Sequence, residues 1–160
     1  MPARASTTIV PHLWYMAEAE AAARFYAKIF PKSRVDRVWK MRSESGAATS
    51  VVCVQFRLLG QPFFAMTAGQ GDNFNNSISF GVPCRTQAEI DRYWKALLKN
   101  GGREVACGWL VDRFGVRWQI YPTVLLEMMA DRNKKKAGRV ATEMQQQVKF
   151  DIAKLEAAFH

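Results

Sequence analysis

The chain has 160 residues, 49% of them hydrophobic and 12% aromatic, which suits one globular domain and excludes a largely disordered protein. It has no run of about 18 apolar residues, and Met1 to Thr8 lacks the apolar segment of a signal peptide, so we expect a cytoplasmic protein without a membrane partner. The net charge of +9 is dispersed, and because no helix has a dense Arg/Lys face, we expect no nucleic-acid partner.

The first half of the chain predicts a strand, a helix and three more strands. Apolar side chains recur at helical spacing from Glu18 until Pro31 ends the helix. A turn at Gly60 joins the last two strands. The predicted elements are strands at 9–15, 33–41, 50–58 and 63–67, a helix at 18–30, and a Gly/Asn-rich linker at 68–76.

The second half predicts a similar order, with two strands identified after the helix, followed by further helices. Thr86 and Glu89 form a capping box at a helix start, and Asn100-Gly101-Gly102 ends that helix. The predicted elements are strands at 77–82, 109–111 and 116–121, a helix at 86–99, and helical segments at 123–129 and 137–159, the last with a break at Phe150-Asp151.

The two halves are an internal repeat, in which Arg24-Phe25-Tyr26 matches Arg92-Tyr93-Trp94 and Gly60 matches Gly115. The repeat predicts an α+β fold of two tandem βαβββ modules with C-terminal helices. We expect a single domain over 1–160, with module one at about 8–68, module two at about 76–122 and a helical tail at about 123–160.

Several short segments resemble a known superfamily. They are Leu13-Trp14-Tyr15, Arg24-Phe25-Tyr26, Ile29-Phe30-Pro31, Gly60-Gln61-Pro62-Phe63, Phe74-Asn75, Ile78-Ser79-Phe80, Thr86-Gln87-Ala88-Glu89, residues 149–157 and, most specific, Cys107-Gly108-Trp109-Leu110 with Asp112, Gly115, Trp118-Gln119 and Pro122. With them the chain resembles the vicinal oxygen chelate superfamily of glyoxalase I, bleomycin-resistance proteins, fosfomycin-resistance enzymes and extradiol dioxygenases. The closer resemblance is to its PhnB-like branch, whose members often carry the label 3-demethylubiquinone-9 3-methyltransferase.

The resemblance implies that each module curls its strands into half of a cup, and that the protein is a homodimer. The apolar stripe Val140, Met144, Val148 and Ile152 also needs a surface to cover. One departure is Met16-Ala17-Glu18, where the family usually has an Asp-Gly turn, so the first strand–helix corner is left open.

The resemblance also implies where metal ligands would stand, on the first and last strand of each module. The matching positions hold Val10, Phe64, Ser77 and Gln119, and His12 lies two residues beyond Val10. A divalent cation needs converging imidazole or oxygen donors, and this set supplies one neutral amide and at most one imidazole. We therefore expect no bound metal.

No cofactor is expected either. Transfer of a methyl group from S-adenosylmethionine usually uses a Gly-rich turn that leads from a strand into a helix, and no predicted helix follows Gly69-Gln70-Gly71. The three cysteines, Cys53, Cys84 and Cys107, include no CxxC pair, so we expect free thiols and no cysteine zinc site.

Without a metal or cofactor, we expect an aromatic cup that binds a small organic ligand. The ligand would be apolar or aromatic, and in one alternative it carries an acidic group. The alternative for its aromatic side chains is simple packing, and a shift of one residue would turn His12 to the helix side. The expected ligand-binding residues are His12, Trp14, Phe64, Ser79, Trp109, Arg117 and Gln119. A binding protein is the first hypothesis. The alternative is an enzyme of the same fold, which would be a metal-dependent lyase or transferase, an enzyme working by acid–base groups, or the ubiquinone methyltransferase of the family label.

Overall fold

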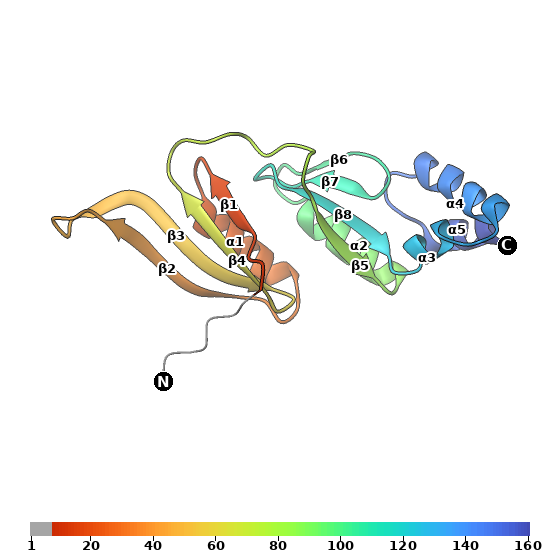
Figure 1. Cartoon of the computed structure of the whole chain (residues 1–160), viewed down its shortest axis with the longest axis horizontal. Coiled ribbons are helices and arrows are strands. Elements are labelled where there is room, and N and C mark those ends of the chain that lie inside the picture. The colour runs from red at the N-terminus through yellow and green to blue at the C-terminus, as the bar shows by residue number, and fades with distance from the viewer. Residues whose placement is uncertain (1–7) are drawn as a thin grey trace. The chain divides into compact units, whose positions relative to one another are not determined.

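The structure is a computed structural model that describes residues 8–160, so residues 1–7, on which the expectation of no signal peptide chiefly rests, lie outside it. The chain divides into two compact units, one ending at Asn73 and the other beginning at Phe74 (Figure 1). Whether they act as the single domain expected above stays a prediction.

The first unit is a four-stranded sheet with one helix on one face. Its elements are β1 (His12–Tyr15), α1 (Ala19–Ile29), β2 (Arg34–Arg42), β3 (Ala48–Leu58) and β4 (Gln61–Thr67). The strands lie in the order β1-β4-β3-β2, with β1 parallel to β4 and the other neighbours antiparallel. Helix α1 buries Ala22 and Tyr26, which lie on one face because they are four positions apart.

The second unit repeats this topology. Its elements are β5 (Phe80–Cys84), α2 (Gln87–Leu97), β6 (Arg103–Glu104), β7 (Trp109–Val111) and β8 (Arg117–Pro122), in the order β5-β8-β7-β6 with β5 parallel to β8. Pro83 fits within β5 because β5 is an edge strand, where a missing amide donor costs no ladder bond. The repeated order confirms two tandem βαβββ modules.

The second unit ends in three helices, α3 (Leu125–Met129), α4 (Lys134–Gln146) and α5 (Ile152–Phe159). The side chain of Asn133 caps α4 by accepting from the amides of Lys135 and Lys136, so α4 starts three residues earlier than expected. The expected break is present at residues 147–151. Val140 is fully buried within the chain itself, so that part of the C-terminal stripe is already covered, whereas Val148 is 42% exposed.

The corner between β1 and α1, which the sequence left open, is a left-handed turn at Glu18, with φ of 65°. That conformation favours glycine, so a residue with a side chain, such as Glu18, is strained there. The side chain of Glu18 does not cap α1; instead the hydroxyl of Thr67 in β4 accepts from the amide of Ala19 at 2.8 Å. Across residues 8–160, no helix is long and apolar enough to span a membrane.

Candidate functional site

In the first unit, His12 and Trp14 lie on the face of the sheet that α1 does not cover. Their neighbours Leu13 and Tyr15 are buried on the helix side, where the Tyr15 hydroxyl lies 3.4 Å from that of Tyr26. His12 pairs with Phe64 in the β1–β4 register, and the two rings lie 4.6 Å apart. Three of the expected ligand-binding residues therefore share one helix-free face.

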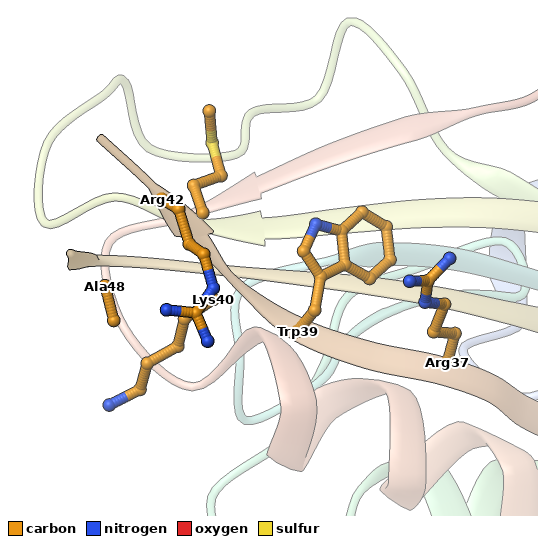
Figure 2. A pocket seen from close by; sticks show the side chains of 6 residues that line it. Arg37, Trp39, Lys40, Arg42 and Ala48 are labelled. Atoms are coloured by element: carbon orange, nitrogen blue, oxygen red, sulfur yellow. The ribbon is translucent and has the colours of Figure 1, made fainter. Parts of the chain in front are cut away.

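A basic hollow lies further along the same sheet, on β2 and the start of β3 (Figure 2). The Arg37 guanidinium lies 5.2 Å from the centre of the Trp39 ring, and Arg42 donates to the carbonyl of Gly46 at 2.8 Å. The hollow has a volume of about 670 Å³ and lies over an exposed hairpin. It is lined by Arg37, Trp39, Lys40, Met41, Arg42 and Ala48. A surface of this kind offers cations but little apolar enclosure.

In the second unit, Gly81, Gln119 and Trp109 stand side by side in register across β5, β8 and β7. The Gln119 amide donates to the Ser79 hydroxyl at 2.7 Å, which fixes the orientation of the Gln119 side chain. The alternate residue Trp118 is buried on the α2 side and donates to the carboxylate of Asp112 at 2.8 Å. Ser79, Trp109 and Gln119 therefore belong to the helix-free face, as the alternation of the strands predicts.

The C-terminal helices complete a cavity of about 420 Å³ on this face, which we call the C-terminal cavity. This volume is within the usual range for small-molecule sites. The sheet contributes Gly81, Trp109, Gln119 and Tyr121, and the loop before β7 contributes Cys107. The residues from the rest of the chain are Leu125, Leu126, Met129, Met144 and Phe150.

Two glycines give this cavity its form. A Cβ at Gly81 would lie 3.0 Å from the Tyr121 ring, so the absence of a side chain lets that ring lie against the strand. A Cβ at Gly108 would lie 2.4 Å from the Phe150 ring and 2.7 Å from the Ile120 carbonyl oxygen, and its φ is +77°. Only glycine fits at position 108, and Phe150 is thereby brought against the sheet.

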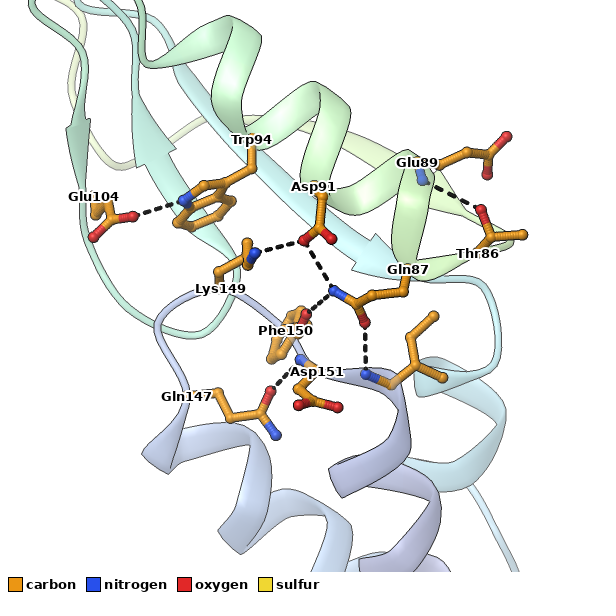
Figure 3. A network of polar contacts seen from close by, with 11 residues as sticks. Thr86, Gln87, Glu89, Asp91, Trp94, Glu104, Gln147, Lys149, Phe150 and Asp151 are labelled. Atoms are coloured by element: carbon orange, nitrogen blue, oxygen red, sulfur yellow. Dashed lines mark hydrogen bonds and ion pairs between the residues drawn. The ribbon is translucent and has the colours of Figure 1, made fainter.

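Residues 147–152, which we call the strap, are held from two sides. On one side the amides of Cys107 and Gly108 donate to the carbonyls of Gln147 and Val148, both at 2.8 Å. On the other side is helix α2. There the Gln87 side chain donates to the Phe150 carbonyl at 2.9 Å and accepts from the Ile152 amide at 3.0 Å (Figure 3).

An ion pair between Lys149 and Asp91 adds to the attachment of the strap to α2. Hydrogen bonds from Lys149 and then Gln87 hold the pKa of the Asp91 carboxyl below its ordinary value. The side chains of both partners are 40–48% exposed to solvent, so the pair contributes little to stability.

Arg117, the remaining member of the expected ligand-binding set, does not line the C-terminal cavity. Its guanidinium donates to the Asn76 side chain at 3.0 Å and to the Gly115 carbonyl. Of the expected set, Trp109 and Gln119 line the cavity, Ser79 supports Gln119, and His12, Trp14 and Phe64 gather on the sheet of the first unit.

The sequence prediction missed most of the wall of the cavity. Tyr121 could have been predicted, because it lies two residues beyond Gln119 on the same strand and therefore on the same face of the sheet. Met129 and Met144 gave no such signal. Their helical spacing predicts an apolar face but does not tell which surface that face covers.

The described residues offer few groups for metal binding or for nucleophilic catalysis. Within residues 8–160, no three His, Cys, Asp or Glu side chains are close enough together to hold a metal ion. Burial, with a smaller contribution from the charge of Glu89, raises the pKa of the Cys84 thiol to about 12, and burial also raises that of Cys53. Cys107 is the partly exposed thiol, at the edge of the cavity.

Comparison with known proteins places these features in a family. A family model described as 3-demethylubiquinone-9 3-methyltransferase matches residues 7–121. The PhnB protein of Bacillus cereus, provisionally named a 3-demethylubiquinone-9 3-methyltransferase, is 27% identical; the match covers 71% of this chain and 98% of that one, with a TM-score of 0.60. No curated protein matches the chain.

Two fosfomycin resistance proteins share the fold at lower identity. FosX from Mesorhizobium loti is 16% identical over 79% of this chain and 98% of its own, with a TM-score of 0.54. FosX from Listeria monocytogenes is 14% identical over 80% of this chain and 99% of its own, with a TM-score of 0.53.

Proposed function

The chain belongs to the family described as 3-demethylubiquinone-9 3-methyltransferase, within the vicinal oxygen chelate superfamily, and from that premise we propose that it binds a small, largely apolar organic molecule in the C-terminal cavity without a metal ion. The observation that carries this proposal is the cavity itself. It combines apolar walls with an amide, Gln119, whose orientation Ser79 fixes. A few fixed polar groups within an apolar cavity give a ligand its orientation and specificity.

Binding is better supported than catalysis by the side chains that line the cavity. Among these lining residues, only Cys107 and Tyr121 carry a titratable group, and neither has a neighbouring carboxylate or imidazole in the wall to act as a base. General acid–base chemistry needs such a pair within hydrogen-bond reach of the substrate. The enzyme hypothesis and the methyltransferase label therefore gain no support from this site.

The helix-free face of the first unit is a further part of the proposal, since His12, Trp14 and Phe64 offer aromatic area there. A homodimer, which the resemblance supports, and a cytoplasmic location complete it. The buried Val140 gives the dimer less support than the sequence suggested, because this residue already packs within its own chain.

The test is a thermal-shift screen of uncharged and acidic aromatic compounds. A ligand at about 100 times its Kd stabilises the folded state by roughly 2.7 kcal/mol, which raises the melting temperature by several degrees. Hits should lose most of this shift in Gln119→Ala and Met129→Ala, while the exposed control variants Gln70→Ala and Met41→Ala should keep it. Loss of the shift in Trp14→Ala alone would instead place the ligand on the face of the first unit.

The proposal is wrong if no compound stabilises the wild type. It is also wrong if Gln119→Ala and Met129→Ala bind every hit as well as their controls do. In that case the ligand binds elsewhere, and the cavity is only a packing defect between the sheet and the helices.

A further inference from the structure

The wall of the C-terminal cavity carries no charged side chain, although the chain has 23 lysine and arginine residues and a net charge of +9. The guanidinium of Arg117, on the same strand as Gln119, is directed to Asn76 and the Gly115 carbonyl. An anionic group within this cavity would give up its hydration without gaining a cation. Such desolvation is costly even in a basic protein.

The polar groups of the wall are neutral and available. Among residues 8–160, neither the Trp109 indole nitrogen nor the Tyr121 hydroxyl has a hydrogen-bond partner, and no buried side-chain nitrogen or oxygen is left unsatisfied. These two groups therefore reach open space. The Trp109 indole can donate to a ligand carbonyl or hydroxyl, and the Tyr121 hydroxyl and the Gln119 amide can donate to either group or accept from a hydroxyl.

The rest of the wall comes from the C-terminal segment. Leu125, Leu126, Met129, Met144 and Phe150 are all apolar, and all lie beyond residue 121, where the match to the family model ends. Methionine side chains are flexible and fill irregular space, so Met129 and Met144 can adapt to the shape of a ligand. The sheet supplies the polar contacts, and the C-terminal segment sets the polarity of the remaining surface.

From these observations we infer that residues 122–160 determine the specificity of the site, and that they select an uncharged, largely apolar aromatic molecule with a carbonyl or hydroxyl group. This inference rests on the proposed function, because it describes the ligand of the same cavity. It differs from the acidic ligand that the sequence left as an alternative.

The experiment compares two fluorescent probes that share one aromatic skeleton, the neutral N-phenyl-1-naphthylamine and its anionic sulfonate analogue 1-anilinonaphthalene-8-sulfonate. The wild type should bind the neutral probe at least about ten-fold more tightly, because the sulfonate would be desolvated without a partner. The overall positive charge acts in the opposite direction, so this preference would have to come from the cavity itself.

Met144→Lys places a cation in the wall and should shift the ratio of the two Kd values at least about ten-fold toward the sulfonate. The matched control Met41→Lys adds the same charge to the first unit and should leave the ratio unchanged. Leu126→Lys is a second test; Leu126 is 60% exposed, so its replacement is tolerated by the fold.

Equal binding of the two probes by the wild type would overturn the inference while leaving a binding site in place. An unchanged ratio in both Met144→Lys and Leu126→Lys would remove the C-terminal segment as the determinant of specificity. If the wild type binds neither probe and no compound in the thermal-shift screen, the proposed function fails and the inference fails with it.

Discussion

The three thiols differ in their surroundings, and this difference makes them useful reporters. Cys53 and Cys84 are buried, and burial raises the pKa of each. A thiol reacts through its thiolate, so at pH 8 these two should be almost inert in the folded protein. Cys107 is partly exposed at the edge of the C-terminal cavity.

We predict that one thiol per chain reacts quickly with a disulfide reagent at pH 8, and that Cys107→Ser removes this reaction. A ligand in the cavity should slow the reaction of Cys107, because it covers the sulfur. In guanidinium chloride all three thiols should react, which is the control for the reagent. Fast reaction of Cys84 in the folded protein, or a Cys107 rate that no ligand changes, would contradict the environments described here.

For single residues, the sequence predicted the side of the sheet on which a side chain lies better than it predicted its hydrogen-bond partners. Strand alternation places Trp118 and Gln119 on opposite faces of β8, and the burial of Leu13 and Tyr15 shows on which side of the sheet His12 lies. The partner of Arg117 was not predictable. Asn76 lies in the connection before β5, and loops give no periodic signal from which a contact can be inferred.

The strap, which joins α4 to the first residue of α5, is the element on which the C-terminal cavity depends. Its contacts with α2 come mainly from Gln87, whose amide bonds both the Phe150 carbonyl and the Ile152 amide. Phe150 lines the cavity and is 1% exposed, so loosening the strap also loosens the wall.

We predict that Gln87→Ala destabilises the attachment of the strap by about 1–2 kcal/mol, since two partly buried hydrogen bonds to the backbone are lost. Hydrogen exchange measured by mass spectrometry should then be roughly 5- to 30-fold faster in peptides covering residues 147–155. Peptides of the first unit should not change. Lys149→Ala, which removes only the exposed ion pair, should have a smaller effect, below about 1 kcal/mol.

Equal exchange in Gln87→Ala and wild type would mean that the backbone bonds from Cys107 and Gly108 hold the strap without help. Gly108→Ala would then be the variant that releases it.

Among the elements, the sequence predicted those with a clear period or a clear end. The α2 start was correct because Thr86 accepts from the amide of Glu89, as the capping box requires. The two-residue strand β6 was missed, since Arg103-Glu104 is too short to show alternation. The predicted start of α4, at residue 137, was three residues too late. The charged run 134–136 is typical of a break between helices, whereas here it forms the first turn of α4 after the N-cap Asn133.

At the scale of the whole molecule, the repeat makes two similar sheets with different free faces. The face of the first unit is aromatic and borders the basic hollow, whereas the face of the second unit has gained the C-terminal helices and a cavity. The family resemblance predicted the topology of both. It did not predict the cavity, because Leu125, Leu126, Met129 and Met144 lie outside the segments that carry the resemblance and beyond the part that matches the family model.

The most direct test of a ligand site in the C-terminal cavity is a methyl NMR titration of protein labelled at its methionine methyl groups. The chain has seven methionines, of which Met129 and Met144 line the cavity and Met41 and Met66 belong to the first unit. As a thermal-shift hit is added, the Met129 and Met144 resonances should move and saturate together, while Met41 stays in place. Saturating shifts at Met41 or Met66, with Met129 and Met144 unmoved, would place the ligand in the first unit and contradict the assignment.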